Sequence, residues 1–407
     1  MREKRPIEKT TPLLTETTRS LMQQFREKGS SLRIVGGAVR DCLLGLPSHD
    51  IDFCTPALPN AVLSWVEQMG WKAFPTGISF GTITVRAPTE EIFEITTLRR
   101  DIRTNGRHAS VEFTTSWLED AARRDFTINA LSCDEEGHLY DFFEGQKDLE
   151  EGRIRFIGHP QTRIQEDYLR ILRYFRFWAR FGKEKPEPSL ISLLERLAPL
   201  LNNLSGERLW KELQGILVLP HFGESLWFMR RILAPLLGIT FPQLVAPTLW
   251  THPLLQDPIL RLGFWISSGT ACQGVSQRLR FSRAEKQRFV LFSTRRTYAL
   301  QKKKEWMPFL LREVPQEDCV HCFAIDIVRA VQERRLSERE AQDLLTEAAR
   351  ASFPSFPLSG ALLLETGLPQ GRAIGEILEK TRVWWAEHCG QPDKEDCLKK
   401  ALQIAAS

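Results

Sequence analysis

The sequence contains no long apolar segment. No hydrophobic run in its 407 residues approaches the roughly eighteen residues that a membrane span requires, so we expect no transmembrane helix. The first residues, MREKRPIEKTT, lack the apolar core of a signal peptide. The eight cysteines are scattered, which is not the spacing of a disulfide framework. These absences predict a cytoplasmic protein with no membrane partner.

Positive charge is unevenly distributed along a chain whose net charge is only +4. Ten Lys or Arg residues lie between Arg278 and Lys304, against the single acid Glu285. A second basic run extends from Arg163 to Lys185. Solvated helix faces also carry such runs, but two clusters in a nearly neutral chain favour a polyanionic partner, with nucleic acid the first candidate.

The most informative segment is LRIVGGAVRDCLLGLPSHDIDF, residues 32–53. It predicts a strand over 32–35, a turn at Gly36 and Gly37, a helix over 38–44, and a second strand that carries Asp50 and Asp52. Glycines let a phosphate approach the backbone, and the free N–H groups of the helix favour an anion. Side chains two apart on a strand share a face, and paired carboxylates suit Mg²⁺. This combination predicts phosphoryl transfer.

Several β-rich runs follow, and polar segments interrupt them. Glu94 lies in the run EIFEITTLRR and is either a third acid beside the Asp pair or an exposed strand carboxylate. The segment Arg99–Ser110 is basic, has no hydrophobic period, and contains Asn105-Gly106, so we expect a mobile loop. It either contacts phosphate or gates the substrate, or it is only a surface excursion.

The segment Glu119–Ala130 predicts a helix, because apolar residues recur at positions 118, 122, 126 and 130. Within it, Arg123 and Arg124 suit a triphosphate clamp in which Asp125 orients one guanidinium.

The pattern becomes almost wholly helical near Gly158, which marks a domain boundary. A helix is expected over 161–182. In it, Asp167, Arg170 and Arg173 are three residues apart and form one ridge. A carboxylate one turn from a guanidinium complements a base edge with an amino donor beside a ring-nitrogen acceptor, the edge of cytosine and adenine. The alternative is an exposed ion pair.

Four motifs, taken in their order along the chain, resemble those of one enzyme family. GGAVRD (36–41), DID (50–52), RRDFTINA (123–130) and EDYLRILRYFRF (166–177) are similar to those of class II tRNA nucleotidyltransferases, the template-free CCA-adding enzymes. The resemblance covers roughly residues 30–220. It implies an α+β fold: a polymerase β-like head with a small mixed sheet flanked by helices, followed by an elongated all-α neck, body and tail. The implied domains are a catalytic head (1–157), a base-selecting neck (158–220), and a tRNA-binding body and tail (221–407).

The resemblance also implies residue roles. Asp50 and Asp52 would bind two Mg²⁺ ions, and Glu94 is added as a candidate catalytic acid. The candidate nucleotide-binding residues are Gly36, Gly37, Arg40, Arg123, Arg124, Asp125, Asn129, Asp167, Arg170, Arg173 and Arg176. Asp167 and Arg170 would pair with the base of CTP or ATP. The Arg99–Ser110 segment corresponds to a flexible loop that CC-only enzymes lack, which favours complete CCA addition.

The expected activity is therefore addition of CCA to the 3′ end of tRNA from CTP and ATP, with release of pyrophosphate. Poly(A) polymerase, CC-adding and A-adding activities share the motifs and stay open, as does the choice between Mg²⁺ and Mn²⁺. A non-catalytic RNA-binding protein is the alternative from another class, but both predicted metal carboxylates are present. The sequence does not indicate an oligomeric state.

Overall fold

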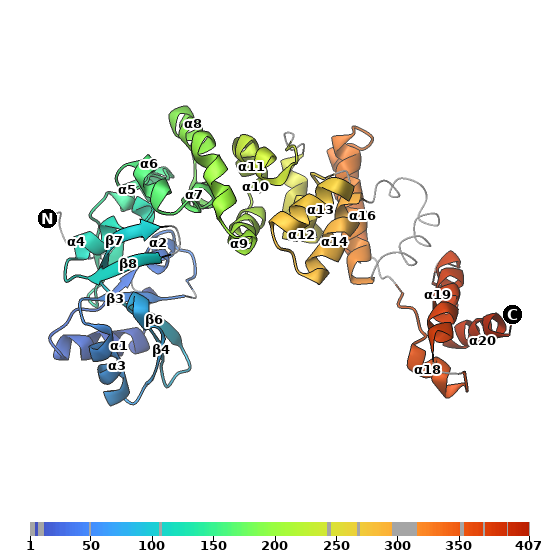
Figure 1. Cartoon of the computed structure of the whole chain (residues 1–407), viewed down its shortest axis with the longest axis horizontal. Coiled ribbons are helices and arrows are strands. Elements are labelled where there is room, and N and C mark those ends of the chain that lie inside the picture. The colour runs from blue at the N-terminus through green and yellow to red at the C-terminus, as the bar shows by residue number, and fades with distance from the viewer. Residues whose placement is uncertain are drawn as a thin grey trace. The chain divides into compact units, whose positions relative to one another are not determined.

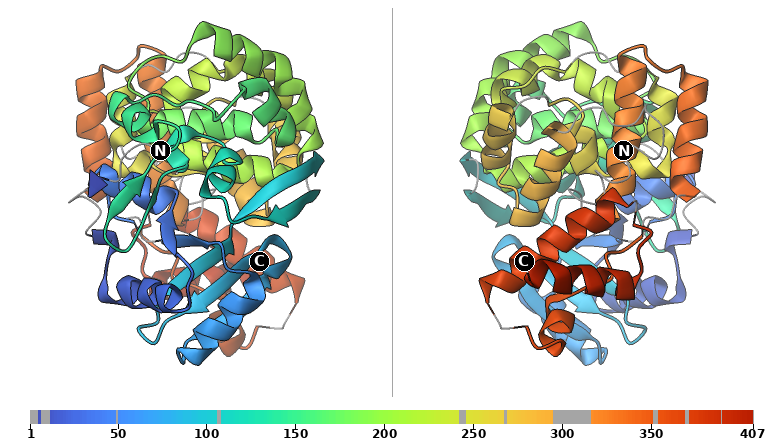
Figure 2. Two further views of the ribbon diagram at one scale, coloured as in Figure 1. Left: turned by 90° about the vertical axis from the view of Figure 1, so that its left-hand side faces the viewer. Right: turned by 90° about the vertical axis from the view of Figure 1, so that its right-hand side faces the viewer.

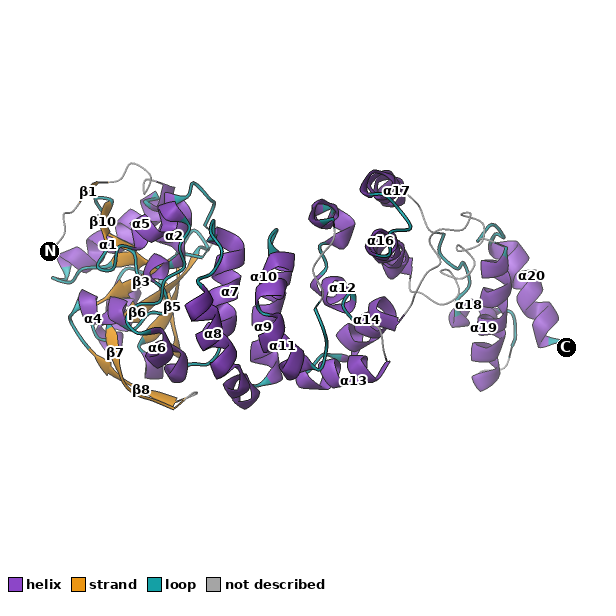
Figure 3. Ribbon diagram, turned by 90° about the horizontal axis from the view of Figure 1, so that it is seen from above, coloured by secondary structure: helices purple, strands orange, loops and turns teal. Residues whose placement is uncertain are grey.

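The computed structural model describes residues 5–6, 12–48, 50–105, 108–241, 246–266, 269–294, 316–350, 354–368, 371–388 and 390–406. The chain divides into two compact units, Met1–Leu204 and Ser205–Ser407 (Figure 1). Every described strand lies in the first unit, and the second unit is helical (Figure 3). This confirms the predicted α+β class. The expected boundary near residue 157 lies inside the first unit, and the functional domains remain a prediction.

The first unit is built on an eight-stranded sheet in the order β1-β10-β9-β2-β3-β6-β5-β4. Only β3 and β6 pair in parallel; the other neighbours are antiparallel. The strands are β1 (Arg5–Pro6), β2 (Arg33–Val35), β3 (Asp52–Thr55), β4 (Lys72–Gly77), β5 (Thr82–Arg86), β6 (Ile92–Thr97), β9 (Ser132–Cys133) and β10 (His138–Tyr140).

One face of the sheet is buried beneath helices. Helix α1 (Glu16–Glu27) is capped by Thr15, whose side chain accepts a hydrogen bond from the Thr18 amide. Helix α3 (Pro59–Gln68) packs on β4, β5 and β6 and meets α1 where Phe25 and Trp65 stack edge to face at 5.4 Å. The strand residues beneath these helices are apolar and almost fully buried: Ile83, Val85, Phe93 and Ile95. Period-two alternation thus gives this part of the sheet a buried face and an open one.

The segment Arg99–Ser110, predicted as a loop, instead forms two strands over its described residues. Strands β7 (Arg99–Asn105) and β8 (His108–Phe113) pair antiparallel, and their register places Asn105 opposite His108. Figure 2 shows the cyan ribbon projecting beside the rest of the first unit. Asn-Gly between two extended runs is a strong hairpin signal, and in this segment it outweighs the missing hydrophobic period.

The remaining elements of the first unit are short helices. They are α2 (Gly37–Leu43), η2 (Ile78–Phe80), α4 (Trp117–Ala122), η3 (Thr127–Asn129), α5 (Gly145–Glu151), α6 (Pro160–Glu166), α7 (Arg170–Phe181), α8 (Pro188–Leu197) and η4 (Ala198–Asn203).

The described part of the second unit consists of helices and 3₁₀ turns. They are α9 (Gly206–Leu217), α10 (Phe222–Phe228), α11 (Arg230–Leu237), η5 (Pro247–Thr251), η6 (Pro253–Leu255), α12 (Pro258–Gly263), α13 (Gly269–Arg278), α14 (Arg283–Thr294), α16 (Gln316–Gln332), α17 (Glu338–Arg350), α18 (Gly360–Glu365), α19 (Arg372–Glu387) and α20 (Lys394–Ala405). A buried guanidinium, that of Arg261, donates to the carbonyls of Leu255 and Trp250 at 2.6 Å and joins α12 to its neighbours. Within the described residues, no helix has the length and apolarity needed to cross a membrane.

Candidate active site

The predicted acids lie where β2, β3 and β6 meet. Asp52 is the first residue of β3; it pairs with Val35 of β2 on one side and with Glu94 of β6 on the other. Asp50 precedes the strand, so the prediction that one strand carries both aspartates is wrong. The reason is that β2 ends at Val35, the partner of Asp52, because the chain turns at Gly36. Residues 50 and 51 therefore have no partner on β2.

The electrostatics of this corner favour a cation. The Asp52 side chain keeps solvent contact, but the protein atoms around it displace enough water to penalise its charged form. This desolvation, together with the negative charges of Glu94 and Asp50, raises the pKa of Asp52 to about 6, although the positive charge of Arg124 acts in the opposite direction. A divalent cation would remove the penalty, and carboxylate oxygens are the ligands that hard cations prefer.

A second carboxylate-rich cluster lies elsewhere in the first unit. Among the described residues, one set of three or more His, Cys, Asp or Glu side chains has its ligand atoms within 4.8 Å of one another: Asp134, Glu136 and His138. The ligand atoms of Asp50, Asp52 and Glu94 are therefore more widely spaced. Asp134 accepts bonds from the amides of Glu136 and His138 and from the Tyr140 hydroxyl, and these contacts close the turn between β9 and β10.

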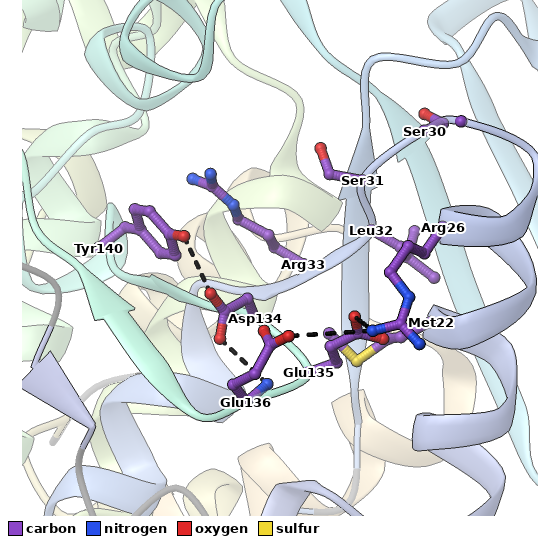
Figure 4. A pocket seen from close by; sticks show the side chains of 11 residues that line it. Met22, Arg26, Ser30, Ser31, Leu32, Arg33, Asp134, Glu135, Glu136 and Tyr140 are labelled. Atoms are coloured by element: carbon purple, nitrogen blue, oxygen red, sulfur yellow. Dashed lines mark hydrogen bonds and ion pairs between the residues drawn. The ribbon is translucent and has the colours of Figure 1, made fainter.

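A cavity of about 430 Å³ adjoins this turn, at the start of β2 and hence at the opposite end of that strand from Gly36 (Figure 4). Acidic and basic side chains face each other there: Arg26 donates to Glu135 at 2.6 Å.

The turn between β2 and α2 brings a guanidinium close to Asp52. Gly36 has φ +71°, and a Cβ atom at this position would lie 3.0 Å from Nη1 of Arg124. Arg124 also donates to the Asn129 carbonyl at 3.3 Å and pairs with Asp120 at 3.3 Å. The glycine turn and a fixed cation therefore lie beside Asp52, as a triphosphate site requires.

The predicted helix over residues 119–130 is wrong. Helix α4 ends at Ala122, and Phe126 is extended and forms a β-bridge with Phe156. The Phe126 ring is fully buried against Phe156 and Phe177, so tertiary packing overrides the helical spacing of the apolar residues. Arg123, at the helix end, pairs with Asp120 at 2.7 Å.

Asp125 does orient a guanidinium, but it is that of Arg173 on α7, at 2.6 Å. Burial opposes the ionisation of Asp125, but Arg173 and the Asn129 side-chain amide outweigh it, so the pKa of Asp125 lies below its ordinary value. Asn129 in turn accepts a bond from Arg40. Arg40 is 5% exposed, pairs with Asp41 at 2.8 Å, and lies over the rings of Phe177 and Phe181. This network joins α2, the segment after α4, and α7.

Asp167, Arg170 and Arg173 do not form the single ridge that their spacing predicts. Helix α6 ends at Glu166, Asp167 is extended with φ −149° and ψ 109°, and α7 begins at Arg170. The Asp167 carboxylate accepts the Leu169 amide at 3.1 Å, a local bond that competes with helix continuation. Arg170 pairs with Glu166 at 2.6 Å rather than with Asp167.

Several basic side chains of the run from Arg163 to Lys185 bind carbonyl or carboxylate oxygens within the first unit. The Nη2 atom of Arg163 donates to the carbonyls of both Arg123 and Arg124, and its Nη1 pairs with Glu166 at 2.6 Å. Arg180 pairs with Asp41 at 3.1 Å. Glu166 and Asp41, together with Asp120, which pairs with Arg123 and Arg124, are site residues that sequence reasoning missed. The i, i+4 spacings of Asp120 with Arg124 and of Glu166 with Arg170 were local signals for two of them.

Comparison with known proteins identifies the family. The model of the Poly A polymerase head domain matches residues 32–155. "CCA tRNA nucleotidyltransferase 1, mitochondrial" of Danio rerio is 36% identical over 96% of this chain and 91% of its own length, and the Homo sapiens protein of that name is 35% identical over 95% and 90%. The chain belongs to the CCA tRNA nucleotidyltransferase family. The resemblance of the four motifs is thereby confirmed, and the protein is a nucleotidyltransferase.

The comparisons extend to bacterial members and solved structures. The CCA-adding enzyme of Streptococcus pneumoniae strain G54 is 31% identical over 88% of this chain and 90% of its own length. The fold matches that of the Bacillus stearothermophilus CCA-adding enzyme in complex with CTP, with a TM-score of 0.71 over 98% of both chains at 24% identity. The Thermotoga maritima CCA-adding enzyme complexed with tRNA gives a TM-score of 0.64 at 21% identity. This family fold agrees with the predicted α+β architecture.

Proposed function

We propose that this protein adds C, C and A in turn to the 3′ end of tRNA, using CTP and ATP without a template. The observation that carries the proposal is the convergence of Asp52, Glu94, the Gly36 turn and Arg124 in a chain whose relatives at 31–36% identity are named for this activity. In each cycle a bond forms between the 3′-oxygen of tRNA and the α-phosphorus. The bond from the α-phosphorus to the bridging oxygen of pyrophosphate breaks, and the proton of the hydroxyl passes to water.

Divalent cations, with Mg²⁺ the proposed ion, would be held by Asp50 and Asp52, with Glu94 as a third acid. When bound, such ions lower the pKa of an attacking hydroxyl and stabilise charge on the leaving oxygens. The chain's own contribution is the cluster of oxygen ligands, whose mutual repulsion adds to desolvation in raising the pKa of Asp52 to about 6.

The triphosphate is proposed to bind at the Gly36-Gly37 turn, with Arg124 and Arg123 as its cations. Arg40 and Arg173 were candidate nucleotide contacts. Because Arg40 is buried on Asp41 and Asn129, and Arg173 is paired with Asp125, we propose that both support the site from beneath. Arg176 stays a candidate nucleotide contact. Asp167 and Arg170 are proposed to meet the base edge, and this requires Arg170 to exchange Glu166 for the nucleotide.

We further propose the functional division into a catalytic head (1–157), a base-selecting neck (158–220), and a tRNA-binding body and tail (221–407). Arg163, Arg170 and Arg173 of the proposed neck contact residues 123–125 of the proposed head. These contacts support the proposal that the neck positions residues of the catalytic site. The cytoplasm is the proposed location, since the seven cysteines in the described residues are free thiols, as a reducing compartment favours. Two relatives are named as mitochondrial proteins, so cell fractionation is the test.

The decisive experiment uses tRNA that ends before CCA and tRNA that ends in CC, each with CTP and ATP supplied separately and together, followed by sequencing of the product ends. Full CCA addition gives CC with CTP alone and CCA with both nucleotides. Termination at CC with both nucleotides indicates a CC-adding enzyme. Incorporation of a single A only on tRNA ending in CC indicates an A-adding enzyme, and long A tails indicate poly(A) polymerase. No incorporation under any condition would contradict the proposal.

A further inference from the structure

The row of paired residues that contains the acids continues across the open face of the sheet. Asp52 pairs with Glu94, Glu94 with Thr84, and Thr84 with Phe74, on strands β3, β6, β5 and β4. Directly paired residues on neighbouring strands place their side chains on the same face. These four residues, here called the acid–aromatic row, therefore cross four strands at spacings of roughly 5 Å.

The surface around the row has the chemistry of a nucleic-acid contact. Phe74 is 42% exposed, and Ile92, two residues before Glu94 on the same face, is 62% exposed. Threonine hydroxyls form two cross-strand pairs: Thr76 bonds Thr84 of the row at 2.9 Å, and Thr82 bonds Thr96 beside the row at 3.0 Å. The paired residues Lys72 and Arg86 add positive charge on the same face. An aromatic platform beside hydroxyls and cations is what proteins use to hold single-stranded RNA.

The geometry of the reaction indicates from which side of Asp52 the nucleophile approaches. In phosphoryl transfer the attacking and leaving oxygens are roughly in line across the phosphorus. The Gly36 turn and Arg124, the proposed triphosphate site, lie on the β2 side of Asp52, since Val35 is its partner there. The nucleophile must then approach from the opposite side, which is the side of Glu94, Thr84 and Phe74.

We propose that the single-stranded 3′ end of the tRNA lies along the acid–aromatic row. Its terminal hydroxyl is placed beside Asp52 and Glu94, and the base of a preceding nucleotide stacks on Phe74. The threonine hydroxyls and the two cations contact the sugar-phosphate chain. This assignment rests on the proposed function and gives roles to residues outside the four sequence motifs.

Steady-state kinetics of Phe74 variants test the assignment. Phe74→Ala should raise KM for tRNA about tenfold, the loss expected for one base–aromatic stack, and leave KM for CTP within about twofold. Phe74→Trp should restore the wild-type value. Leu58→Ala is the matched control, because Leu58 is an apolar residue of the same unit with 56% exposure at the start of α3 and should change neither constant. Circular dichroism melts establish that each variant is folded.

A crosslinking experiment distinguishes direct contact of Phe74 with tRNA from a purely structural role of this side chain. Phe74→p-benzoylphenylalanine, irradiated with end-labelled tRNA lacking CCA, should crosslink to the last few nucleotides, and unlabelled tRNA should compete. An unchanged KM for tRNA in Phe74→Ala, or crosslinks confined to the duplex, would overturn the proposal. If gel filtration of Phe74→Ala gave a changed elution volume while the KM for tRNA stayed at the wild-type value, this face would be an interface with another protein instead. A wild-type enzyme that adds no nucleotide refutes the proposed function, whereas the crosslink still reports on the row.

Discussion

The carboxylate of Asp52 is unfavourably charged at neutral pH unless a cation lies near it. Its pKa of about 6 lies above the ordinary value of 3.8, so ionisation at pH 7 costs folding free energy rather than adding to it. The shift corresponds to at most about 3 kcal/mol. Because the side chain is exposed, solvent screening reduces this to about 1 kcal/mol. Function, not stability, accounts for an acid at this position.

Asp52→Asn should therefore lower kcat by at least about 10³-fold, since several kcal/mol of charge stabilisation disappear. Without divalent cations its free energy of unfolding should rise by up to about 1 kcal/mol, because the desolvation of a charged group and its repulsion from Glu94 and Asp50 are both removed. Thermal melts with and without Mg²⁺ measure both states: the ion should raise the Tm of the wild type but not that of the variant. Substantial nucleotide incorporation by Asp52→Asn would contradict the metal assignment.

The turn at Gly36 allows a matched comparison between two glycines. Gly36 and Gly45 have nearly the same φ, +71° and +70°, but a Cβ on Gly36 would crowd Arg124, whereas a Cβ on Gly45 would meet nothing within 4 Å. Both Gly→Ala variants should lose about 1–2 kcal/mol of stability through the left-handed backbone. Only Gly36→Ala should also raise KM for CTP, by about tenfold, because it displaces a charged donor. Equal KM values in the two variants would remove Arg124 from the triphosphate site.

At the scale of elements, α6 fixes the end of α4. The carbonyls of Arg123 and Arg124 lie at the C-terminus of α4, where no intrahelical donor remains, and Arg163 supplies one. Its positive charge also complements the negative end of the helix dipole. The side chain of Arg124 is therefore oriented through its own backbone, by a residue that is distant in the chain.

Arg163→Lys keeps the charge but loses the planar fork that reaches both carbonyls and Glu166. We expect a loss of about 1–2 kcal/mol in the free energy of unfolding and a several-fold rise in KM for CTP, with KM for tRNA unchanged. Urea unfolding and steady-state kinetics measure the two effects. Arg196→Lys, at an exposed arginine of α8, is the control. A drop in stability without a change in KM would reduce Arg163 to a structural role.

The break between α6 and α7 places Asp167 outside both helices, where it has an extended backbone. If its carboxylate accepts from the base amine, Asp167→Ala should retain part of the activity but lose discrimination against GTP and UTP. Incorporation of the four nucleotides, each supplied alone, measures the selectivity. Unchanged selectivity would refute the base-edge argument.

Sequence reasoning succeeded for this molecule where the deciding interactions are local. The glycine turn and the β-rich runs of β5 and β6 can be read within a few residues. It failed where distant contacts decide. The bridge from Phe126 to Phe156 ended a predicted helix.

The arginines of α6 and α7 show the same limit, because a charge pattern does not reveal its partners. Arg163, Arg173 and Arg180 bind residues of the first unit.

At the scale of the whole molecule, the described parts of the two basic clusters therefore differ in character; residues 295–304 of the second cluster lie outside the described residues. Partners inside the first unit account for much of the run from Arg163 to Lys185. In the second unit, Arg280, Arg283 and Lys286 are exposed where α13 leads into α14. Arg280 pairs with Glu207 at 3.9 Å, a weak surface contact. We therefore predict that Arg280, Arg283 and Lys286, rather than the arginines of the run from Arg163 to Lys185, contact the phosphates of tRNA.

Charge reversal tests this assignment through the salt dependence of tRNA binding. Removal of one phosphate contact should reduce the slope of log K against log salt concentration by about 0.7–0.9, so Arg283→Glu with Lys286→Glu should reduce it by about 1.5. Arg339→Glu is the control, because this exposed arginine lies between Glu338 and Glu340, where a polyanion would be repelled. Fluorescence anisotropy with labelled tRNA at several salt concentrations gives the slopes. If the double variant and the control have the same slope as the wild type, the phosphate contacts lie on another surface, and the charge between residues 278 and 288 is only a solvated helix face.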